Sequence, residues 1–547
     1  MDRRRFLLSS GRLTAAGLAA AALARCAPQP SVSPSAGASG RPSPSGGPAS
    51  PSVAPSLEPA PTLGTPRPRD DRIVRENAKR GTLGWILGGP QYPLSCFVAP
   101  ASPAAGERLT LHVNSDVPFD VEWYRLGWYD GDGGRLVRVD RGLPAQTGGP
   151  IEPDPMTGRV EAPWPVALQI TVPADWLSGL YTVVIRDGRS GPIARGSGAG
   201  YRGGPAAAAP FVVRPVSATA ETPAPVLFVS AATTWQAYNP WGGADFYGAS
   251  AEDAPEAAAG RRAVEISFDR PYAGDQGCGY QRRWELQFVR WQEREGRDVE
   301  YMADVDLELH PDLLNGRRLI VFAGHHEYWS RPMRNAIEGA VAAGINVAFL
   351  SANEVFWQVR FGSSPLGPAR RVTCYKSARL DPFAITNPSL TTTRWRQPPV
   401  SDPEASLIGQ MYGHIVRRPA DWVVRSSRHW LYAGTGLRDG DHLANLVGQE
   451  YDSYFPQFAH PGTVLLARSP VDAVITGTEI YPSPPIHTAT VYAADSGATV
   501  FAAGTFQWSW ALDAYGDRTY AGVKTPVDPR VGIMTRNLFD RLGDGPA

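Results

Sequence analysis

The hydrophobic pattern is most informative between residues 318 and 361. Two short apolar runs, at 319–322 and 345–350, have the length of fully buried strands. Between them, apolar side chains recur at four-residue spacing from Met333 to Val341, which predicts a helix that buries one face. Ser330 is expected to cap the start of this helix and Gly344 to end it. The segment therefore predicts a β-α-β unit of a parallel sheet.

The chain before this unit has a different pattern. Short segments of alternating apolar and polar residues, separated by Gly and Pro, predict an N-terminal β-sandwich over residues 72–216. The expected strands lie at 109–113, 120–124, 168–172, 181–185 and 211–214.

From residue 222 buried strands alternate with a helix, which predicts an α/β domain with a doubly wound parallel sheet over 222–547. Its end is expected to be a β-rich extension that closes with a helix near residue 530. The other expected elements are strands at 226–229, 299–302, 464–466 and 500–503, and a helix at 284–294.

The N-terminus carries the pattern of an export signal. Arg3, Arg4 and Arg5 precede an apolar stretch at 13–23, which predicts a twin-arginine signal over residues 1–26. Lipidation at Cys26 and plain cleavage there both remain open. Residues 27–71 are almost entirely Pro, Ser, Ala and Gly, so we expect a disordered tether. The protein is thus expected to be exported, in the cell envelope or secreted, and to contact the membrane only through the signal or a lipid.

Composition excludes several classes of function. The 53 basic and 53 acidic residues give no net charge, so no nucleic-acid partner is implied. Beyond Cys26, only Cys96, Cys278 and Cys374 remain, without a CxxC pair. This argues against a disulfide framework and against a thiolate metal site.

Polar side chains follow three of the predicted strands. Ligands of open α/β sheets bind beyond the carboxyl ends of the strands, so these residues are candidates for a ligand site. Cysteine hydrolases of this topology carry their nucleophile at the position that Asn353 occupies here. Because asparagine is not a nucleophile, covalent catalysis by a cysteine amidotransferase is disfavoured. The strand-end residues are His325, His326, Glu327, Asn353 and Glu354, together with Tyr238 in a Trp-rich segment.

An ordered series of motifs resembles one known family. WYRLGWYDGDGGRLV (123–137), TWQAYNPWGG (234–243), SFDRPY (267–272), GHHEYWSRPMRNAIE (324–338), SANEVFWQVR (351–360) and GTFQWSWALD (504–513) are similar to the large, or beta, subunit of N,N-dimethylformamidase. The similarity runs from about residue 75 to the C-terminus.

This resemblance implies a glutamine-amidotransferase-like fold and a mononuclear ferric iron held by two tyrosines and a glutamate. Carried over to this chain, the metal ligands are Glu327, Tyr238 and Tyr181. His325, His326 and Asn353 are then candidates for proton transfer and for orienting the substrate. Phenolate and carboxylate oxygens are hard ligands that suit ferric iron, and a bound metal can activate water.

The sequence thus predicts an exported, metal-dependent amidohydrolase that cleaves the C–N bond of a small amide. Whether a small partner subunit exists is left open. The alternative is an envelope-tethered protein on the same fold that binds glycan or polymer without catalysis. The sandwich, the tether and the 16 Trp residues would suit that alternative.

Overall fold

The computed structural model describes residues 66, 70–87, 94–188, 205–216, 222–248, 261–273, 277–474 and 484–543. The predicted export signal, Cys26 and nearly all of the predicted tether lie outside the described residues. Among the described helices, none has the length and apolar character that a membrane crossing requires.

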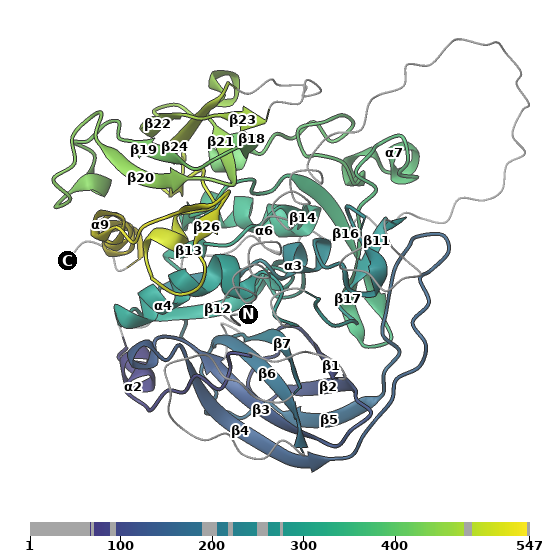
Figure 1. The fold of residues 1–547 in the computed structure, drawn as a ribbon. Coiled ribbons are helices and arrows are strands. Elements are labelled where there is room, and N and C mark those ends of the chain that lie inside the picture. Colours follow the sequence, from purple (N-terminus) through teal and green to yellow (C-terminus); the bar gives the residue numbers. More distant parts are fainter. Residues whose placement is uncertain are drawn as a thin grey trace, which may run out of the picture.

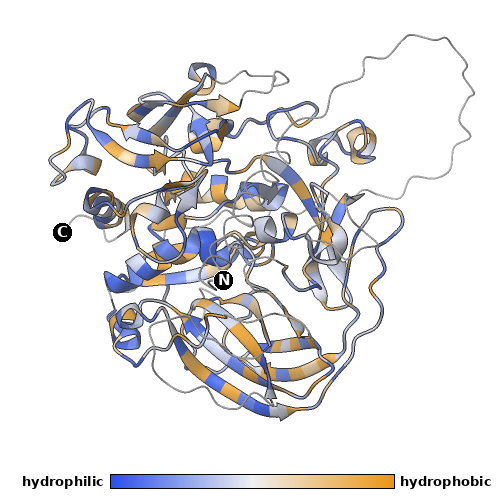
Figure 2. Ribbon diagram, viewed as in Figure 1, coloured by the Kyte–Doolittle hydropathy of each residue, from blue (hydrophilic) through white to orange (hydrophobic). Residues whose placement is uncertain are grey.

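Two antiparallel sheets that share one hydrophobic core form the N-terminal part of the protein (Figure 1). One sheet has the strand order β1-β2-β5 and the other β4-β3-β6-β7. Apolar and polar residues alternate along several of these strands (Figure 2). The bounds are β1 (Ser95–Ala99), β2 (Arg108–Asn114), β3 (Phe119–Leu126), β4 (Gly134–Leu143), β5 (Val166–Thr171), β6 (Gly179–Asp187) and β7 (Ala206–Val213).

The sequence pattern did not predict β1 and β4. Four of the five residues of β1 are buried, so the strand lacks alternation. In β4 most residues are half-buried or exposed and several are charged, so the strand lacks an apolar stripe. Both strands are specified by their neighbours, β2 and β3.

A mixed sheet dominates the second part. Within the described residues, seven strands pair in the order β12-β8-β13-β15-β25-β24-β22. The strands from β12 to β25 run parallel, whereas β24 and β22 run antiparallel to their neighbours. The predicted parallel sheet is therefore observed in part, because a tight turn at residues 494–498 joins β24 to β25 and such a turn imposes antiparallel pairing. The bounds are β8 (Val226–Ser230), β12 (Val299–Ala303), β13 (Leu319–Phe322), β15 (Asn346–Phe349), β22 (Val464–Pro470), β24 (Ile486–Ala493) and β25 (Thr499–Ala502).

The predicted β-α-β unit is present as β13, α6 (Arg331–Ala342) and β15. Ser330 caps α6, since its hydroxyl accepts a hydrogen bond from the Met333 amide at 3.2 Å. Gly344 has φ +94°, the left-handed conformation that ends a helix at low cost. Met333 and Ile337 pack against strand residues in one buried cluster.

A second sheet, β11-β17-β16-β14, stands beside the unit. The sequence pattern placed residues 328–330 in a loop, but they form β14, which pairs in parallel with β16. This pairing fixes the chain on the C-terminal side of Glu327. The bounds are β11 (Glu265–Ser267), β14 (Tyr328–Ser330), β16 (Trp357–Ser364) and β17 (Gly367–Thr373).

The remaining helices and strands cover the sheets or build the upper, β-rich part in Figure 1. The helices are α2 (Arg72–Asn77), α3 (Ala232–Ala237), α4 (Leu286–Arg294), α5 (Asp306–Leu309), α7 (Phe383–Thr386), α8 (Ala405–Ile408) and α9 (Pro529–Leu538). The strands are β9 (Ala244–Asp245), β10 (Arg261–Arg262), β18 (Met411–Val416), β19 (Ala420–Val423), β20 (His442–Val447), β21 (Glu450–Ser453), β23 (Ala473–Val474), β26 (Thr519–Tyr520) and β27 (Val523–Lys524).

A buried ion pair joins the two parts. Arg125 of β3 contacts Glu293 of α4 through two hydrogen bonds of 2.8 and 2.6 Å, and both side chains are fully buried. Arg125→Met should leave the Glu293 carboxylate buried without its counter-charge and lower the free energy of unfolding by about 3–5 kcal/mol. Denaturant unfolding followed by Trp fluorescence measures this loss.

A surface ion pair provides the matched control. Arg141 of β4 pairs with Asp120 at 3.0 Å and is 64% exposed. Arg141→Met should therefore change the free energy of unfolding by no more than about 1 kcal/mol. Equal losses in the two variants would show that the buried pair does not hold the two parts together.

Candidate functional site

Glu327 occupies the loop between β13 and β14 and is held by its backbone on both sides. Its N–H donates to the Thr234 hydroxyl of α3 at 3.1 Å. Its carbonyl accepts from the amides of Phe356 and Trp357 at 2.9 and 2.8 Å. The side chain is buried, so the carboxylate has a fixed position between three elements of the fold.

Three side chains donate to the Glu327 carboxylate. The Tyr238 hydroxyl lies 2.6 Å from Oε2, and the Tyr247 hydroxyl lies 2.8 Å from Oε1. The Trp357 indole donates to Oε1 at 3.0 Å. The two phenolic oxygens are 3.0 Å apart. Tyr238, Tyr247 and Glu327, the Tyr–Tyr–Glu cluster, thus gather oxygen atoms within about one hydrogen-bond length of each other.

The fold explains why these three residues meet. Tyr238 directly follows α3, which itself follows strand β8 of the large sheet. Tyr247 follows β9 in the same segment of chain beyond β8, and its amide donates to the Asp245 carboxylate at 2.8 Å. Glu327 follows β13, the neighbour of β8. All three come from the carboxyl edge of two adjacent parallel strands, where ligand sites of such sheets form.

Two opposing effects act on the Glu327 carboxyl. Burial raises its pKa, because a charge is poorly solvated in the protein interior. The positive charge of Lys376 and the hydrogen bonds from Tyr238, Tyr247 and Trp357 favour the ionised form and oppose the increase. A cation at this position would favour the ionised form further.

His325 and Asn353 lie beside the Tyr–Tyr–Glu cluster. His325 Nε2 is 3.3 Å from Glu327 Oε2 and 3.7 Å from Glu450 Oε2. Asn353 Nδ2 is 3.4 Å from the same ring nitrogen. Burial, followed by the charges of His326 and Lys376, holds the pKa of His325 well below its usual value, so the imidazole is neutral at pH 7. Tyr238, Glu327 and Asn353 therefore lie at one edge of the sheet, linked through His325 and the Glu327 carboxylate.

His326 does not join this group. Its Nε2–H donates to the Val229 carbonyl at 3.1 Å, and its ring packs edge-on against Phe322. Its backbone amide donates to the Glu354 carboxylate at 2.9 Å. Burial lowers the pKa of His326 to about 3. The candidates His326 and Glu354 thus support the loop beneath the site, and the geometry gives His326 no contact with the carboxylate.

Tyr181 lies elsewhere. It belongs to β6 in the core of the N-terminal sheets, where its ring stacks on Trp176 and its hydroxyl donates to the Leu177 carbonyl at 2.8 Å. The structure therefore does not bring Tyr181 together with Tyr238 and Glu327. Tyr247 stands in the position that the sequence analysis gave to Tyr181.

Tyr247 carried one usable signal in the sequence. It lies nine residues after Tyr238, on the same excursion from the end of β8, so both phenols start from one strand end. Tyr181 belongs to a different predicted domain. Trp357 and Glu450 lacked such a signal, because β16 and β21 reach the site only through tertiary packing.

The Tyr–Tyr–Glu cluster has the donor chemistry that ferric iron prefers. Two phenols and a carboxylate supply three hard oxygen atoms, and both phenolic hydrogens already point at the carboxylate. Across the described ranges, no group of three or more His, Cys, Asp or Glu side chains is placed to hold a metal ion. Tyrosine oxygens fall outside that set of residue types. The two phenols and the carboxylate fit the ferric iron that the resemblance implies.

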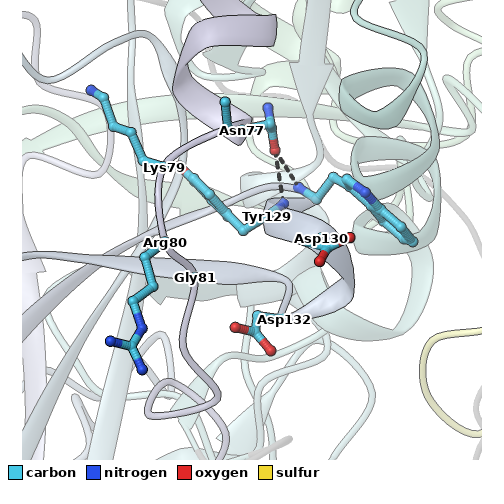
Figure 3. A pocket seen from close by; sticks show the side chains of 9 residues that line it. Asn77, Lys79, Arg80, Gly81, Tyr129, Asp130 and Asp132 are labelled. Carbon is cyan, nitrogen blue, oxygen red and sulfur yellow. Dashed lines mark hydrogen bonds between the residues drawn. The ribbon is translucent and has the colours of Figure 1, made fainter.

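A separate hollow of about 540 Å³ lies between the end of α2 and the turn from β3 to β4 (Figure 3). Asn77 shapes it by accepting from the amides of Trp128 and Tyr129 at 2.8 and 3.0 Å. Its lining combines basic and acidic side chains: Lys79, Arg80, Asp130 and Asp132. It shares no lining residue with the Tyr–Tyr–Glu cluster.

Comparison with known proteins agrees with the motif resemblance. A family model described as N,N-dimethylformamidase beta subunit-like, C-terminal, matches residues 120–521. The match covers well over half of the chain and contains Tyr238, Tyr247, Glu327, His325 and Asn353. It starts later and ends earlier than the motifs suggested. A comparison with curated proteins found no significant match.

Proposed function

Because the chain belongs to the N,N-dimethylformamidase beta subunit-like family, we propose that it is a metal-dependent hydrolase of small amides. Membership implies an amidase-like role at the level of the family. The observation that carries the finer proposal is the Tyr–Tyr–Glu cluster, in which three buried or half-buried oxygen donors meet at one strand edge. The expectation of export remains a prediction.

In this proposal Tyr238, Tyr247 and Glu327 would hold a ferric ion, with both tyrosines as phenolates. When bound, such an ion polarises an amide carbonyl and acidifies water at neutral pH. Trp357 keeps its indole N–H on the carboxylate and orients it. The backbone contacts of Glu327 with Thr234 and Phe356 fix the carboxylate from behind.

The neighbouring side chains supply proton transfer. Neutral His325 accepts a proton from the attacking water while the water oxygen bonds to the amide carbon, and it then returns this proton to the leaving nitrogen as the C–N bond breaks. Asn353 Nδ2 lies close to the same imidazole and donates a hydrogen bond to the oxygen that gains charge. Glu450 Oε2 lies 3.7 Å from the same ring nitrogen that faces Glu327, so two carboxyl groups flank the proton-transfer atom.

His325→Ala tests the proton-transfer role. The variant should keep its iron, because none of the three proposed ligands changes, while kcat falls by about 10²–10⁴-fold. The measurement is turnover of N,N-dimethylformamide and simple primary amides, normalised to iron content. His442→Ala, which removes an exposed imidazole paired with Asp421, is the control and should leave kcat unchanged. A His325→Ala enzyme with full iron and full turnover would contradict the role.

The alternative is a protein that binds glycan or polymer without catalysis. It would be favoured if the purified protein bound no metal, hydrolysed none of the amides and still bound an envelope polymer. Glycan-array binding by wild-type protein, compared with Glu327→Gln, separates the two functions.

A further inference from the structure

Lys376 and Tyr328 form a layer behind Tyr247. Lys376 Nζ lies 2.7 Å from the Tyr328 hydroxyl and 3.1 Å from the centre of the Tyr247 ring. Tyr328 is fully buried, and its hydroxyl is hydrogen-bonded to the Tyr247 hydroxyl. The ammonium also lies 4.8 Å from the centre of the Trp357 ring. A positive charge therefore sits against two aromatic residues that contact the Glu327 carboxylate.

The hydrogen bonds in this layer have a fixed direction. An ammonium group can only donate, so the Tyr328 oxygen accepts from Lys376. A phenol has one hydrogen, and that of Tyr328 must then point at the Tyr247 oxygen. The Tyr247 hydroxyl lies 2.8 Å from Glu327 Oε1 and 3.0 Å from the Tyr238 oxygen, and the carboxylate is the stronger acceptor for its one hydrogen. Donation runs one way, from Lys376 through Tyr328 and Tyr247 to Glu327.

The loop that carries Lys376 is firmly placed. Lys376 follows β17 and has φ +57°, a conformation that a residue with a side chain adopts only where its surroundings fix it. The preceding amides of Cys374 and Tyr375 donate to the Val264 carbonyl and the Thr392 hydroxyl at 2.8 and 2.9 Å. The backbone from which the Lys376 side chain extends is therefore set by the fold, and the Tyr328 hydroxyl and the Tyr247 ring hold its ammonium group.

We propose that Tyr328 is a positioning residue that donates a hydrogen bond to the Tyr247 oxygen, the atom that would hold the metal, and that Lys376 fixes the direction of this donor. The inference rests on the proposed function, because it assigns an outer layer to the same metal site. A donor aimed at the phenolate holds Tyr247 in one orientation and draws electron density from its oxygen. The Lys376 ammonium would offset part of the negative charge of two phenolates and a carboxylate, which is costly to bury in the protein interior.

Two variants test the inference on the full chain. Tyr328→Phe removes only the donor, and Lys376→Met removes the charge at similar length. Both should keep iron when loaded, but the phenolate-to-iron absorption band should move to longer wavelength, because a phenolate without its donor releases electrons more easily. Loss of iron to a chelator should become about 10- to 100-fold faster. Lys376→Arg keeps a positively charged donor. Its absorption band and its rate of iron loss should therefore lie between those of the wild type and those of Lys376→Met. Tyr375→Phe, at the neighbouring position, should behave as wild type.

The outcomes separate the two proposals. A wild-type protein without iron or colour overturns the proposed function and this inference with it. A coloured wild type whose band and rate of iron loss are unchanged in Tyr328→Phe overturns the inference alone. A shift in Tyr328→Phe without one in Lys376→Met refutes the role given to Lys376.

Discussion

Glu327→Gln is expected to remove both the metal and the hydrolytic activity. Glutamine has the size of glutamate but is neutral, so one of the three anionic donors disappears while the packing persists. In the variant, the N–H₂ group of the glutamine faces tyrosine and tryptophan donors that contact a carboxylate oxygen in the wild type. The hydrogen bonds lost in this way should lower the free energy of unfolding by about 1–3 kcal/mol. Glu327 lies in a loop but is buried, so we expect its replacement to lower stability as well as metal binding. Iron per chain, turnover and circular dichroism measure the three effects.

Glu285→Gln is the matched control for this variant. Glu285 is also fully buried and accepts from the Ala231 amide and the Trp235 indole at 2.9 and 3.0 Å. Burial raises the pKa of its carboxyl to about 8, so the group is largely neutral at pH 7 and glutamine mimics it. This control should keep iron and activity. Full iron in Glu327→Gln, or equal loss in both variants, would contradict the assignment of Glu327 as a ligand.

Tyr247→Phe is expected to have the second large effect. Phenylalanine keeps the ring that stacks on Tyr238 at 4.6 Å between centroids but lacks the oxygen that lies 2.8 Å from Glu327. Iron content should fall to a small fraction of the wild-type value, and the visible colour should disappear. Hydrolysis should fall with the iron.

Tyr181→Phe separates the ligand set seen in the structure from the one expected from the motifs. Its hydroxyl donates only to a backbone carbonyl in the sandwich core, so its loss should cost about 1 kcal/mol of stability and leave iron unchanged. The opposite pattern, with iron lost in Tyr181→Phe and kept in Tyr247→Phe, would show that the motif alignment was right and the geometric assignment wrong.

The parts of the fold that the sequence predicted are those with strong local signals. β13, α6 and β15 appear within one residue of the expected limits, since apolar runs and a four-residue period are written into the local sequence. β14 could not be predicted, because it has three residues and exists only through its pairing with β16. The antiparallel strands of the large sheet likewise depend on a turn and not on strand composition.

The residues of the candidate site likewise differ in whether a local sequence signal marks them. Glu327 and Asn353 could be placed at one sheet edge because each lies within five residues of the end of a predicted strand. Tyr247 shares a strand end with Tyr238, which was its one signal in the sequence, but its distance from Glu327 is set by how the segment after β8 folds back. Lys376 reaches the cluster from the end of β17, in a different sheet, and only tertiary structure reveals its contacts. The boundaries of the predicted domains remain predictions.

Whether the Tyr–Tyr–Glu cluster holds iron is tested by the metal content and the visible spectrum of the wild-type protein purified without chelators. We expect about one iron per chain and a charge-transfer band from phenolate to ferric iron. A colourless protein without stoichiometric iron, also after anaerobic loading with ferrous salt and exposure to air, would contradict it.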